Sequence, residues 1–215
     1  MIDFHTHSLF SDGELVPSEL VRRAIDTGYR AIAITDHGDG SNLQGIIPNI
    51  VRVCEEVSGE WDVTAIPGIE LTHAPQGQIA TLANKARELG AKVVIVHGET
   101  IVEPVCKGTN RAALEADVDI LAHPGFISEE EVALAKEKEI YLEISGRKGH
   151  SFTNGYVAGL ARKVGAKLVI NSDAHAPGDL MTLAFAKNIG LGAGMAEAEV
   201  ETALKNAEEL LEKIT

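Results

Sequence analysis

The chain has 215 residues, a length that suits one well-buried domain and is short for two. Its formal charge of −13 argues against stable nucleic-acid binding over a broad basic surface, because such binding depends on neutralising many phosphates. The sequence shows neither a secretory signal nor an apolar run of membrane-spanning length. We therefore expect residues 1–215 to form a single cytoplasmic domain with no membrane partner.

Short β-branched or apolar runs alternate with longer helix-like stretches, a pattern typical of parallel βαβ units. Seven strands are predicted, at Ile2 to His5, Ala31 to Thr35, Val63 to Glu70, Val93 to His97, Asp119 to His123, Ile140 to Ser145 and Leu168 to Asn171. Helices are predicted between them, at Ser18 to Asp26, Ile46 to Val57, Ile79 to Leu89, Ala112 to Ala116, Glu129 to Lys138 and Gly155 to Lys163. The order predicts an α/β fold with a seven-stranded barrel.

The last segment, Ala196 to Ile214, has the pattern of a charged amphipathic helix. Its apolar stripe consists of Val200, Ala203, Leu204, Ala207, Leu210 and Leu211. Helices of this kind owe most of their stability to packing, so we expect the stripe to lie against the barrel.

Six of the eight histidines stand at or just after the C-terminal end of a predicted strand: His5, His7, His37, His97, His123 and His175. Parallel α/β barrels carry their active sites at this end, because the loops that follow the strands converge there. His5 and His7 are two residues apart, so in a strand both rings would point to the same side. Such a pair alone would more often be structural, but here it is one of several.

Carboxylates occur at the same places. Asp12 lies in the first loop, Glu70 follows an apolar run that should be buried, and Asp173 follows the seventh strand. An unpaired ionised Glu at a buried position would be costly, which favours a cation as its partner. The combined ligand set is His5, His7, Asp12, His37, Glu70, His97, His123, Asp173 and His175. It is too large for one tetrahedral ion and suits two or three divalent ions, with Zn, Mn and Fe all acceptable to these donors.

These residues resemble the PHP family, the polymerase and histidinol phosphatase domain, over essentially the whole chain. The matching motifs are His5-Thr6-His7, Thr35-Asp36-His37, Gly68-Ile69-Glu70, His97, His123-Pro124 and Asp173-Ala174-His175. The resemblance implies a distorted (βα)7 TIM-like barrel with a trinuclear centre. It assigns His5, His7, Glu70 and Asp173 to the first ion, Glu70, His97 and His123 to the second, and Asp12, His37 and His175 to the third. Family members use either His or Asp at the Asp12 position.

The predicted function is hydrolysis of a small phosphate monoester, histidinol-phosphate-like or other, by a metal-activated hydroxide, with Glu70 and His97 essential. Three divalent ions would outweigh the site's carboxylates and leave an anion receptor in an acidic chain. Arg147 and Lys148 are candidates to clamp the phosphate, although solvated loop charges are an equally good interpretation. His150 is a candidate proton donor to the leaving group.

Three supporting roles are also predicted. His73 could line the pocket, although for His73 and His150 an exposed or supporting position is at least as good an interpretation. Asp36 and Glu143 are expected to orient histidines that bind metal.

Three other functions remain open. A nuclease or nucleotide phosphatase would use the same chemistry, although aromatic residues make up only 4% of the chain and offer few stacking platforms. An amidohydrolase also begins with a His-x-His strand but would not need both the Asp36-His37 and the Asp173-Ala174-His175 pairs. A metal-bound scaffold without activity is the non-enzymatic alternative. The sequence carries no signal for the oligomeric state.

Overall fold

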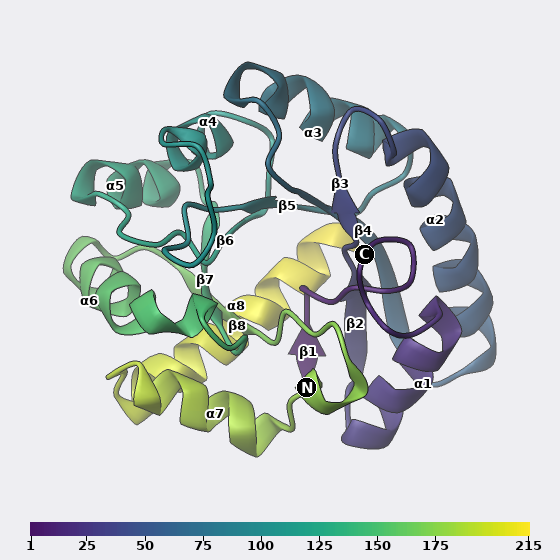
Figure 1. The fold of residues 1–215 in the computed structure, drawn as a ribbon. Coiled ribbons are helices and arrows are strands. Elements are labelled where there is room, and N and C mark those ends of the chain that lie inside the picture. Colours follow the sequence, from purple (N-terminus) through teal and green to yellow (C-terminus); the bar gives the residue numbers. More distant parts are fainter.

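Parallel strands form a nearly closed barrel in the computed structural model, which describes all residues 1–215 (Figure 1). The strand order around the barrel is β1 (Ile2–Asp3), β2 (Ala31–Ile34), β4 (Thr64–Leu71), β5 (Val93–His97), β6 (Ile120–Ala122), β7 (Tyr141–Ser145) and β8 (Leu168–Asn171). All adjacent pairs are parallel. The predicted seven-stranded barrel is confirmed, with a further two-residue strand, β3 (His37–Gly38), that pairs with β4 beyond the end of β2.

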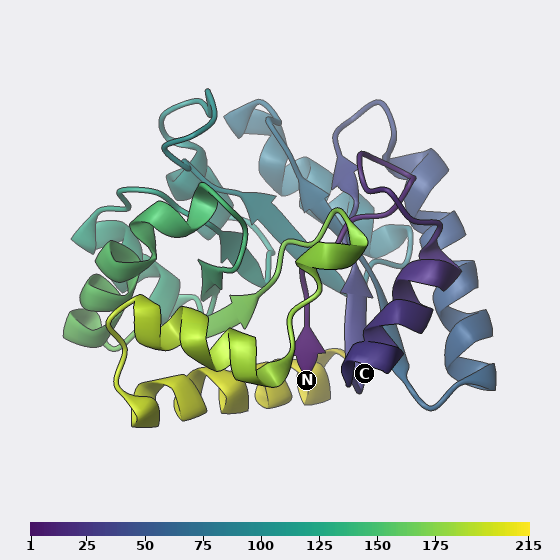
Figure 2. The same cartoon turned by 60° about the horizontal axis from the view of Figure 1, so that its bottom comes forward.

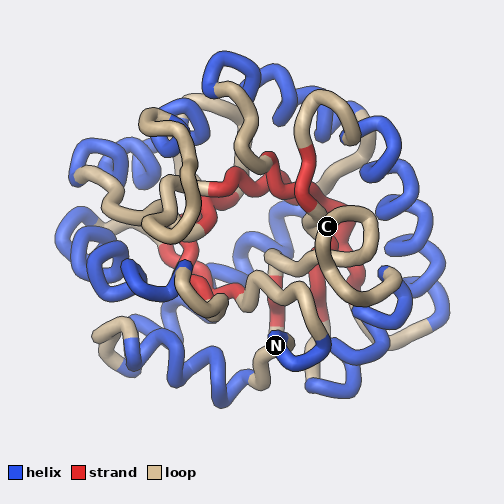
Figure 3. The backbone as a smooth tube through the Cα atoms, viewed as in Figure 1, coloured by secondary structure: helices blue, strands red, loops and turns tan.

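Helices surround the strands, and the loops gather over one end of the barrel (Figure 3). The helices are α1 (Pro17–Thr27), α2 (Leu43–Glu60), α3 (Ile79–Glu88), α4 (Thr109–Leu114), α5 (Glu129–Glu137), α6 (Asn154–Val164), α7 (Leu183–Gly192) and α8 (Glu197–Ile214). Short 3-10 turns lie at Gln76–Gln78, Pro177–Asp179 and His150–Thr153. Every predicted helix is present, and α7 is an addition. None of the helices is both long and apolar enough to cross a membrane.

The apolar side chains form two layers, one inside the barrel and one between the strands and the outer helices. The inner layer fills the N-terminal end of the barrel, where α8 covers it with Ala207, Leu210 and Leu211. Figure 2 shows α8 crossing beneath the strands, on the side opposite the gathered loops. The predicted packing face of the last helix is therefore confirmed for five of its six residues, since Leu204 is only partly buried. The opposite end of the barrel is left free for polar side chains.

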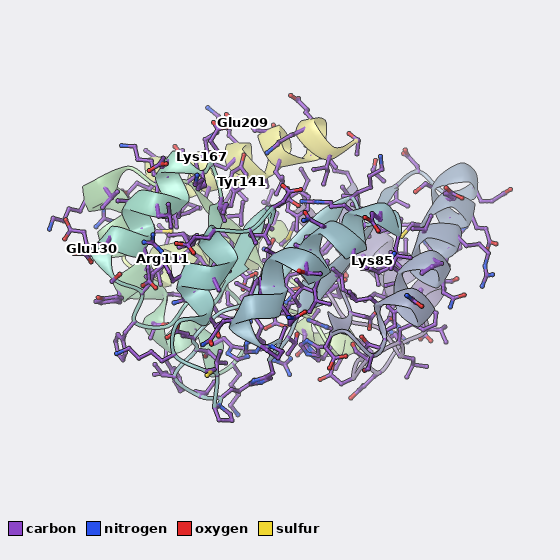
Figure 4. The ribbon with its side chains drawn as sticks, turned by 90° about the horizontal axis from the view of Figure 1, so that it is seen from above. Lys85, Arg111, Glu130, Tyr141, Lys167 and Glu209 are labelled. Atoms are coloured by element: carbon purple, nitrogen blue, oxygen red, sulfur yellow. The ribbon has the colours of Figure 1, made fainter.

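Ion pairs reinforce this attachment of α8. Lys167, just before β8, donates to Glu209 of α8 at 2.8 Å, and its ammonium lies 5.6 Å from the centre of the Tyr141 ring. Figure 4 shows these three residues together where α8 meets the barrel. Lys167 and Glu209 are exposed, so their ion pair contributes little to stability and mainly fixes the position of the helix, whereas Tyr141 is buried.

The barrel closes between β1 and β8 through polar groups instead of a regular strand ladder. The one backbone bridge here joins Thr6 to Ala174, outside the named strands. The buried Asp3 carboxylate accepts from the backbone N–H of Ser172 at 3.2 Å, and the Asn171 side chain accepts from the N–H of Phe4 at 3.1 Å. The ladder of β1 thus ends at Asp3, two residues earlier than predicted, and the chain that carries His5 is held by side chains from the other edge.

Gly68 marks a point where neighbouring strands leave no room for a side chain. A Cβ atom at this position would lie 2.5 Å from Val93 Cγ1, 2.7 Å from Thr35 Cγ2 and 2.8 Å from the Val93 carbonyl oxygen. The contact with backbone cannot be relieved by a rotamer change. This is a physical reason for glycine two residues before Glu70.

We expect Gly68→Ala to destabilise the fold by about 1–3 kcal/mol, because it overpacks the barrel interior. The matched control is Gly159→Ala in α6, where nothing lies within 4 Å of the new Cβ and the helix gains up to about 1 kcal/mol. Urea unfolding midpoints measure both. Equal midpoints for the two variants would contradict this account of Gly68.

Candidate metal centre

All nine candidate ligands lie together at the C-terminal end of the barrel, the end opposite α8. The innermost group combines His5 and His7 from the segment after β1 with Glu70 of β4 and Asp173 after β8. His5 Nε2 lies 3.3 Å from Glu70 Oε1 and 3.7 Å from Asp173 Oδ1. His7 Nε2 lies 3.3 Å from Asp173 Oδ1 and 3.7 Å from Glu70 Oε2. Each of the two histidines therefore lies close to both carboxylates. All four side chains are buried.

A second group lies nearer the surface and centres on Asp12. Its Oδ1 atom is 3.2 Å from His175 Nε2 and 3.4 Å from His37 Nε2. The His7 ring lies 4.0 Å from that of His175 and 4.2 Å from that of His37, measured between centroids. Asp12, His37, His175 and His7 thus offer donor atoms close enough to hold a metal ion.

Glu70 connects the whole cluster. Its Oε1 atom lies 3.5 Å from His123 Nε2 as well as 3.3 Å from His5, and its Oε2 atom lies 2.7 Å from His37 Nδ1. The His97 ring meets the His123 ring edge to face, with centroids 4.4 Å apart. A carboxylate between three histidines from different strand ends has the position of a bridging ligand.

Two of the gathered residues adopt the left-handed backbone conformation that non-glycine residues avoid. His123 has a φ of 28° and Asp173 a φ of 54°. Each such residue costs about 1–3 kcal/mol, so the surrounding structure must hold it there. The strain turns both side chains into the cluster directly after their strands end, and it cannot be read from the sequence.

Neighbouring groups orient the histidines. Glu143 of β7 lies 2.7 Å from His5 Nδ1 and accepts from the Asn171 amide at 3.0 Å, so Nε2 of His5 is directed at Glu70 and Asp173. His175 Nδ1 lies 3.0 Å from the Asp173 carbonyl oxygen, which can only accept, so its Nε2 presents a lone pair to the site. Partners of this kind fix the tautomer of histidines that bind metal.

The prediction that Asp36 orients a histidine is wrong. Its carboxylate accepts from the backbone and hydroxyl groups of Ser8 and Ser11, at 2.6 to 3.0 Å. Three of these donors bond Oδ1 and one bonds Oδ2, and no histidine is among the partners of Asp36. Asp36 instead fixes the loop that carries Asp12.

The ligand set passes a test of fit for metal ions. Several buried polar atoms of the cluster have no hydrogen-bond partner, namely His5 Nε2, His7 Nδ1 and Nε2, His123 Nδ1, Glu70 Oε1 and Asp173 Oδ1. Native proteins rarely leave such atoms unsatisfied, because each costs about 1–3 kcal/mol. Nitrogen and oxygen atoms that converge without partners have the chemistry of a site for divalent ions.

The electrostatics show the same need for positive charge. Burial by itself would raise the pKa of Glu70, but His5 and His37 outweigh it and hold this pKa well below its usual range. The pKa of Asp173 is lowered in the same way, by His5 and His7. Burial lowers the pKa of His7 to about 3, so its ring is neutral and free to act as a ligand. Both carboxylates therefore remain ionised beside positive charge, since Glu70 outweighs burial and raises the pKa of His37 to about 10.

The predicted substrate-contact residues occupy different positions. Arg147 lies in the pocket, about a third exposed, and donates to the Asp173 carbonyl at 3.3 Å. His150 is buried, with its ring stacked 4.1 Å from that of His123. Lys148 is exposed beside the site, and His73 lies at its margin, 5.2 Å from the His97 ring.

Glu103 is a further residue of the site, and it is not among the predicted site residues. Its carboxylate lies 3.1 Å from His97 Nε2 and 3.4 Å from His150 Nε2. It stands inside a loop between β5 and α4, away from any strand end and any motif, so no local pattern could have indicated it.

The pocket formed by these groups is small and entirely polar. Its volume is about 40 Å³, and its lining is Asp12, His37, His97, Glu103, His123, Arg147, His150, Asp173 and His175. A larger cleft of about 400 Å³ lies between α6 and α8 and is lined by residues such as Ala158, Met195 and Asn206. That cleft holds no histidine, so the chemistry belongs to the smaller pocket.

The fold and the site together define a parallel α/β barrel with a cluster of histidines and carboxylates at the C-terminal ends of its strands. The chain belongs to the PHP family, since the model of the PHP domain matches residues 3–214. The family resemblance predicted from the motifs is thereby confirmed.

Three relatives span most of the chain. An uncharacterized protein of Methanocaldococcus jannaschii is 54% identical and covers 99% of both chains. Ribonuclease P protein component 3 of Methanosarcina barkeri is 31% identical, covering 88% of this chain and 80% of its own length. A protein named "Probable phosphatase TTE1963", from Caldanaerobacter subterraneus, is 27% identical, covering 81% of this chain and 76% of its own.

Solved structures share the fold. A chain of an archaeal ribonuclease P with mature tRNA matches with a TM-score of 0.67 and 18% identity, over 98% of this chain and 91% of that one. Histidinol phosphate phosphatase from Lactococcus lactis, solved with zinc, L-histidinol and phosphate, matches with a TM-score of 0.60 and 19% identity, over 91% and 94%. At these identities the likeness shows the fold alone.

Adding Zn²⁺ or Mn²⁺ to metal-free protein should raise the melting temperature, because ions that bind only the folded cluster stabilise it. One ion at a hundredfold excess over its Kd contributes about 2.7 kcal/mol, and a chain of this size gains about 2–4 °C per kcal/mol. Differential scanning fluorimetry before and after chelation measures the change. An unchanged melting temperature, with no metal retained after dialysis, would contradict the metal centre.

Proposed function

We propose that the chain is a metal-dependent phosphoesterase that hydrolyses a small phosphate monoester at a centre of two or three divalent ions. The observation that carries the proposal is the gathering of nine candidate ligands at one end of the barrel, five of which (His5, His7, Glu70, His123 and Asp173) have buried polar atoms without hydrogen-bond partners. Membership of the PHP family and the relative named as a phosphatase support hydrolysis of a phosphate ester. The Lactococcus lactis neighbour makes zinc and histidinol phosphate the first metal and substrate to test, beside Mn and Fe.

Each ion has its own set of residues in this proposal, and Glu70 belongs to two of the sets. His5, His7, Glu70 and Asp173 would hold the first ion, and Glu70 would be shared with the second, which His97 and His123 complete. Asp12, His37 and His175 would hold the third. When bound, divalent ions generate a nucleophile from water at neutral pH and stabilise the charge that develops on phosphorus oxygens.

The chain's own residues bind and orient the ester. The Arg147 guanidinium faces the pocket and is held by the Asp173 carbonyl at 3.3 Å, with Asp179 Oδ2 3.9 Å away. Its remaining N–H groups can donate to a phosphate oxygen. His150 is a candidate proton donor to the leaving group. Thr100 Oγ1 lies 2.8 Å from its Nδ1, so its Nε2 faces the pocket. The assignments of His150 and Arg147 remain predictions.

Glu70→Gln should lower phosphate release about a hundredfold or more while the chain stays folded. The change keeps the shape of the side chain but removes the charge shared by two ion sites, and metal stabilisation of this reaction is worth several kcal/mol. Phosphate release from histidinol phosphate and a chromogenic ester, with metal content from elemental analysis, tests the proposal. His97→Ala should have a similar effect.

The control for these variants is Glu115→Gln, an exposed carboxylate that pairs with Arg111 on α4. It should retain wild-type turnover. Full activity in metal-reloaded Glu70→Gln would sink the proposed mechanism, and the absence of metal from wild-type protein would remove its basis.

Arg147→Ala should raise the KM for a phosphate ester at least about tenfold without changing the metal content, because a charge-assisted hydrogen bond is worth about 1.5–3 kcal/mol. Lys148→Ala is the matched control, since Lys148 is the neighbouring exposed cation. Steady-state kinetics on both variants measure the difference. An equal effect from the two substitutions would show that Arg147 acts only through the general charge of its loop.

A nucleotide or short RNA is the second candidate substrate. One relative is a ribonuclease P component. In addition, two site residues are each followed in the sequence, within three positions, by an exposed aromatic residue. Phe126 is three residues after His123 and Phe152 is two after His150, with 68% and 71% of their surfaces exposed. Tyr156 meets the Phe126 ring edge to face at 5.3 Å. Such rings can stack on bases, so nucleoside monophosphates and end-labelled RNA belong in the substrate panel.

A further inference from the structure

The loop between β5 and α4, residues 98–108, brings a carboxylate into the cluster that belongs to no motif of the ligand set. Glu103 Oε2 lies 3.1 Å from His97 Nε2 and 3.4 Å from His73 Nε2, and Oε1 lies 3.4 Å from His150 Nε2. His73, His97 and Glu103 offer donor atoms close enough to share a metal ion. One carboxylate thus stands among three imidazoles.

The hydrogen bonding of His97 defines what must lie between it and Glu103. His97 Nδ1 lies 3.2 Å from the Gly98 carbonyl oxygen, which can only accept, so Nδ1 carries the proton. A neutral ring then presents the lone pair of Nε2 to the carboxylate oxygen 3.1 Å away. Two lone pairs at this distance repel, so a cation has to separate them. That cation is either a second proton on the ring or a metal ion.

The pair formed by Asp12 and His175 has the same geometry. His175 Nδ1 is 3.0 Å from the Asp173 carbonyl oxygen, and its Nε2 faces Asp12 Oδ1 at 3.2 Å. Ligand atoms that bind one ion at about 2.0–2.2 Å are roughly 3.0–3.5 Å apart. The separation of His97 and Glu103 falls in this range. Asp12 is already a candidate ligand, and Glu103 repeats its arrangement on the other side of the site.

The proposed ligand sets leave a place for such a group. Two histidines and two carboxylates surround the first ion, whereas the second has only Glu70, His97 and His123. A tetrahedral ion with three protein ligands keeps one open position, and a larger coordination number leaves more. We propose that the Glu103 carboxylate, carried by the loop, is an additional ligand of the ion held by His97.

The ends of the loop are anchored, which makes it a rigid support for a ligand. Glu99 Oε1 accepts from the backbone N–H groups of Gly108 and Asn110 at 2.8 and 3.0 Å. The Asn110 amide donates to the Pro124 carbonyl at 2.8 Å, and Gln76 donates to the Lys107 carbonyl at 2.7 Å. The loop is therefore fastened to the segment that follows His123 and to the turn before α3. Glu103 reaches the site from this fixed frame.

The inference rests on the proposed metal centre and is tested by binding as well as by activity. Metal-free wild type, Glu103→Gln and Glu115→Gln are titrated with Zn²⁺ by calorimetry, and with Co²⁺ by visible absorption. Glu103→Gln should weaken one site at least about tenfold and change the absorption of its Co²⁺ ion, whereas Glu115→Gln should match the wild type. Asp12→Asn should weaken a different site, so the double variant should weaken two.

Identical Zn²⁺ isotherms and Co²⁺ spectra for wild type and Glu103→Gln would overturn the proposal and leave Glu103 as the partner of a protonated His97. Glu103→Ala repeats the test by truncation, and the circular dichroism of each metal-free variant verifies its fold. Phosphate release is measured on the same samples. If the wild type binds Zn²⁺ without turnover, the proposed phosphoesterase activity is contradicted, and the titrations still decide whether Glu103 is a ligand. If the wild type binds no Zn²⁺, both proposals are overturned.

Discussion

Two carboxylates buried at the end of an apolar barrel are the constraint on which the structure depends. Glu70 and Asp173 are almost completely inaccessible to solvent, and an isolated ionised carboxylate in such a place costs many kcal/mol. The histidines around them offset part of this cost, but several of their nitrogen atoms lack partners themselves. Further positive charge in the cluster would lower the remaining cost. Divalent ions supply it with the fewest groups, since each carries two charges in the space of one water molecule.

In this fold, apolar side chains fill one end of the barrel and polar side chains gather at the other. At the N-terminal end, α8 covers an apolar interior that resists polar substitution. At the other end, candidate ligands lie at or shortly after the ends of several strands: His97 is the last residue of β5, His123 follows β6 directly, and Asp173 is two residues after β8. The polar closure between β1 and β8 serves the same purpose, because Asn171 bonds both to the backbone of Phe4 and to Glu143, the partner of His5. One network thus completes the barrel and sets the tautomer of an innermost histidine.

The barrel and the gathering of the nine ligands could be predicted from the sequence, because both follow from local patterns. Each strand is a short apolar run, and a histidine or a carboxylate stands at or near the end of every strand except Ile140 to Ser145. Features that depend on tertiary contact could not be predicted. Asp36 sits beside His37 in the chain, but the nearer donors of Ser8 and Ser11 satisfy it. Glu103 enters the site from a loop without periodicity, and α7 lacks the polar face by which an amphipathic helix is recognised.

The size of the pocket separates the chemistry from the choice of substrate. A space of about 40 Å³ is on the scale of one or two water molecules, which is too small for the organic part of an ester. The rest of any ester must therefore lie outside, against the loops that follow β5, β6 and β7. These loops carry both the cations, such as Arg147, and the exposed rings of Phe126 and Phe152. Barrels of this kind keep the reacting centre on the strands and place recognition on the loops, so two chains with the same ligands can hydrolyse different esters.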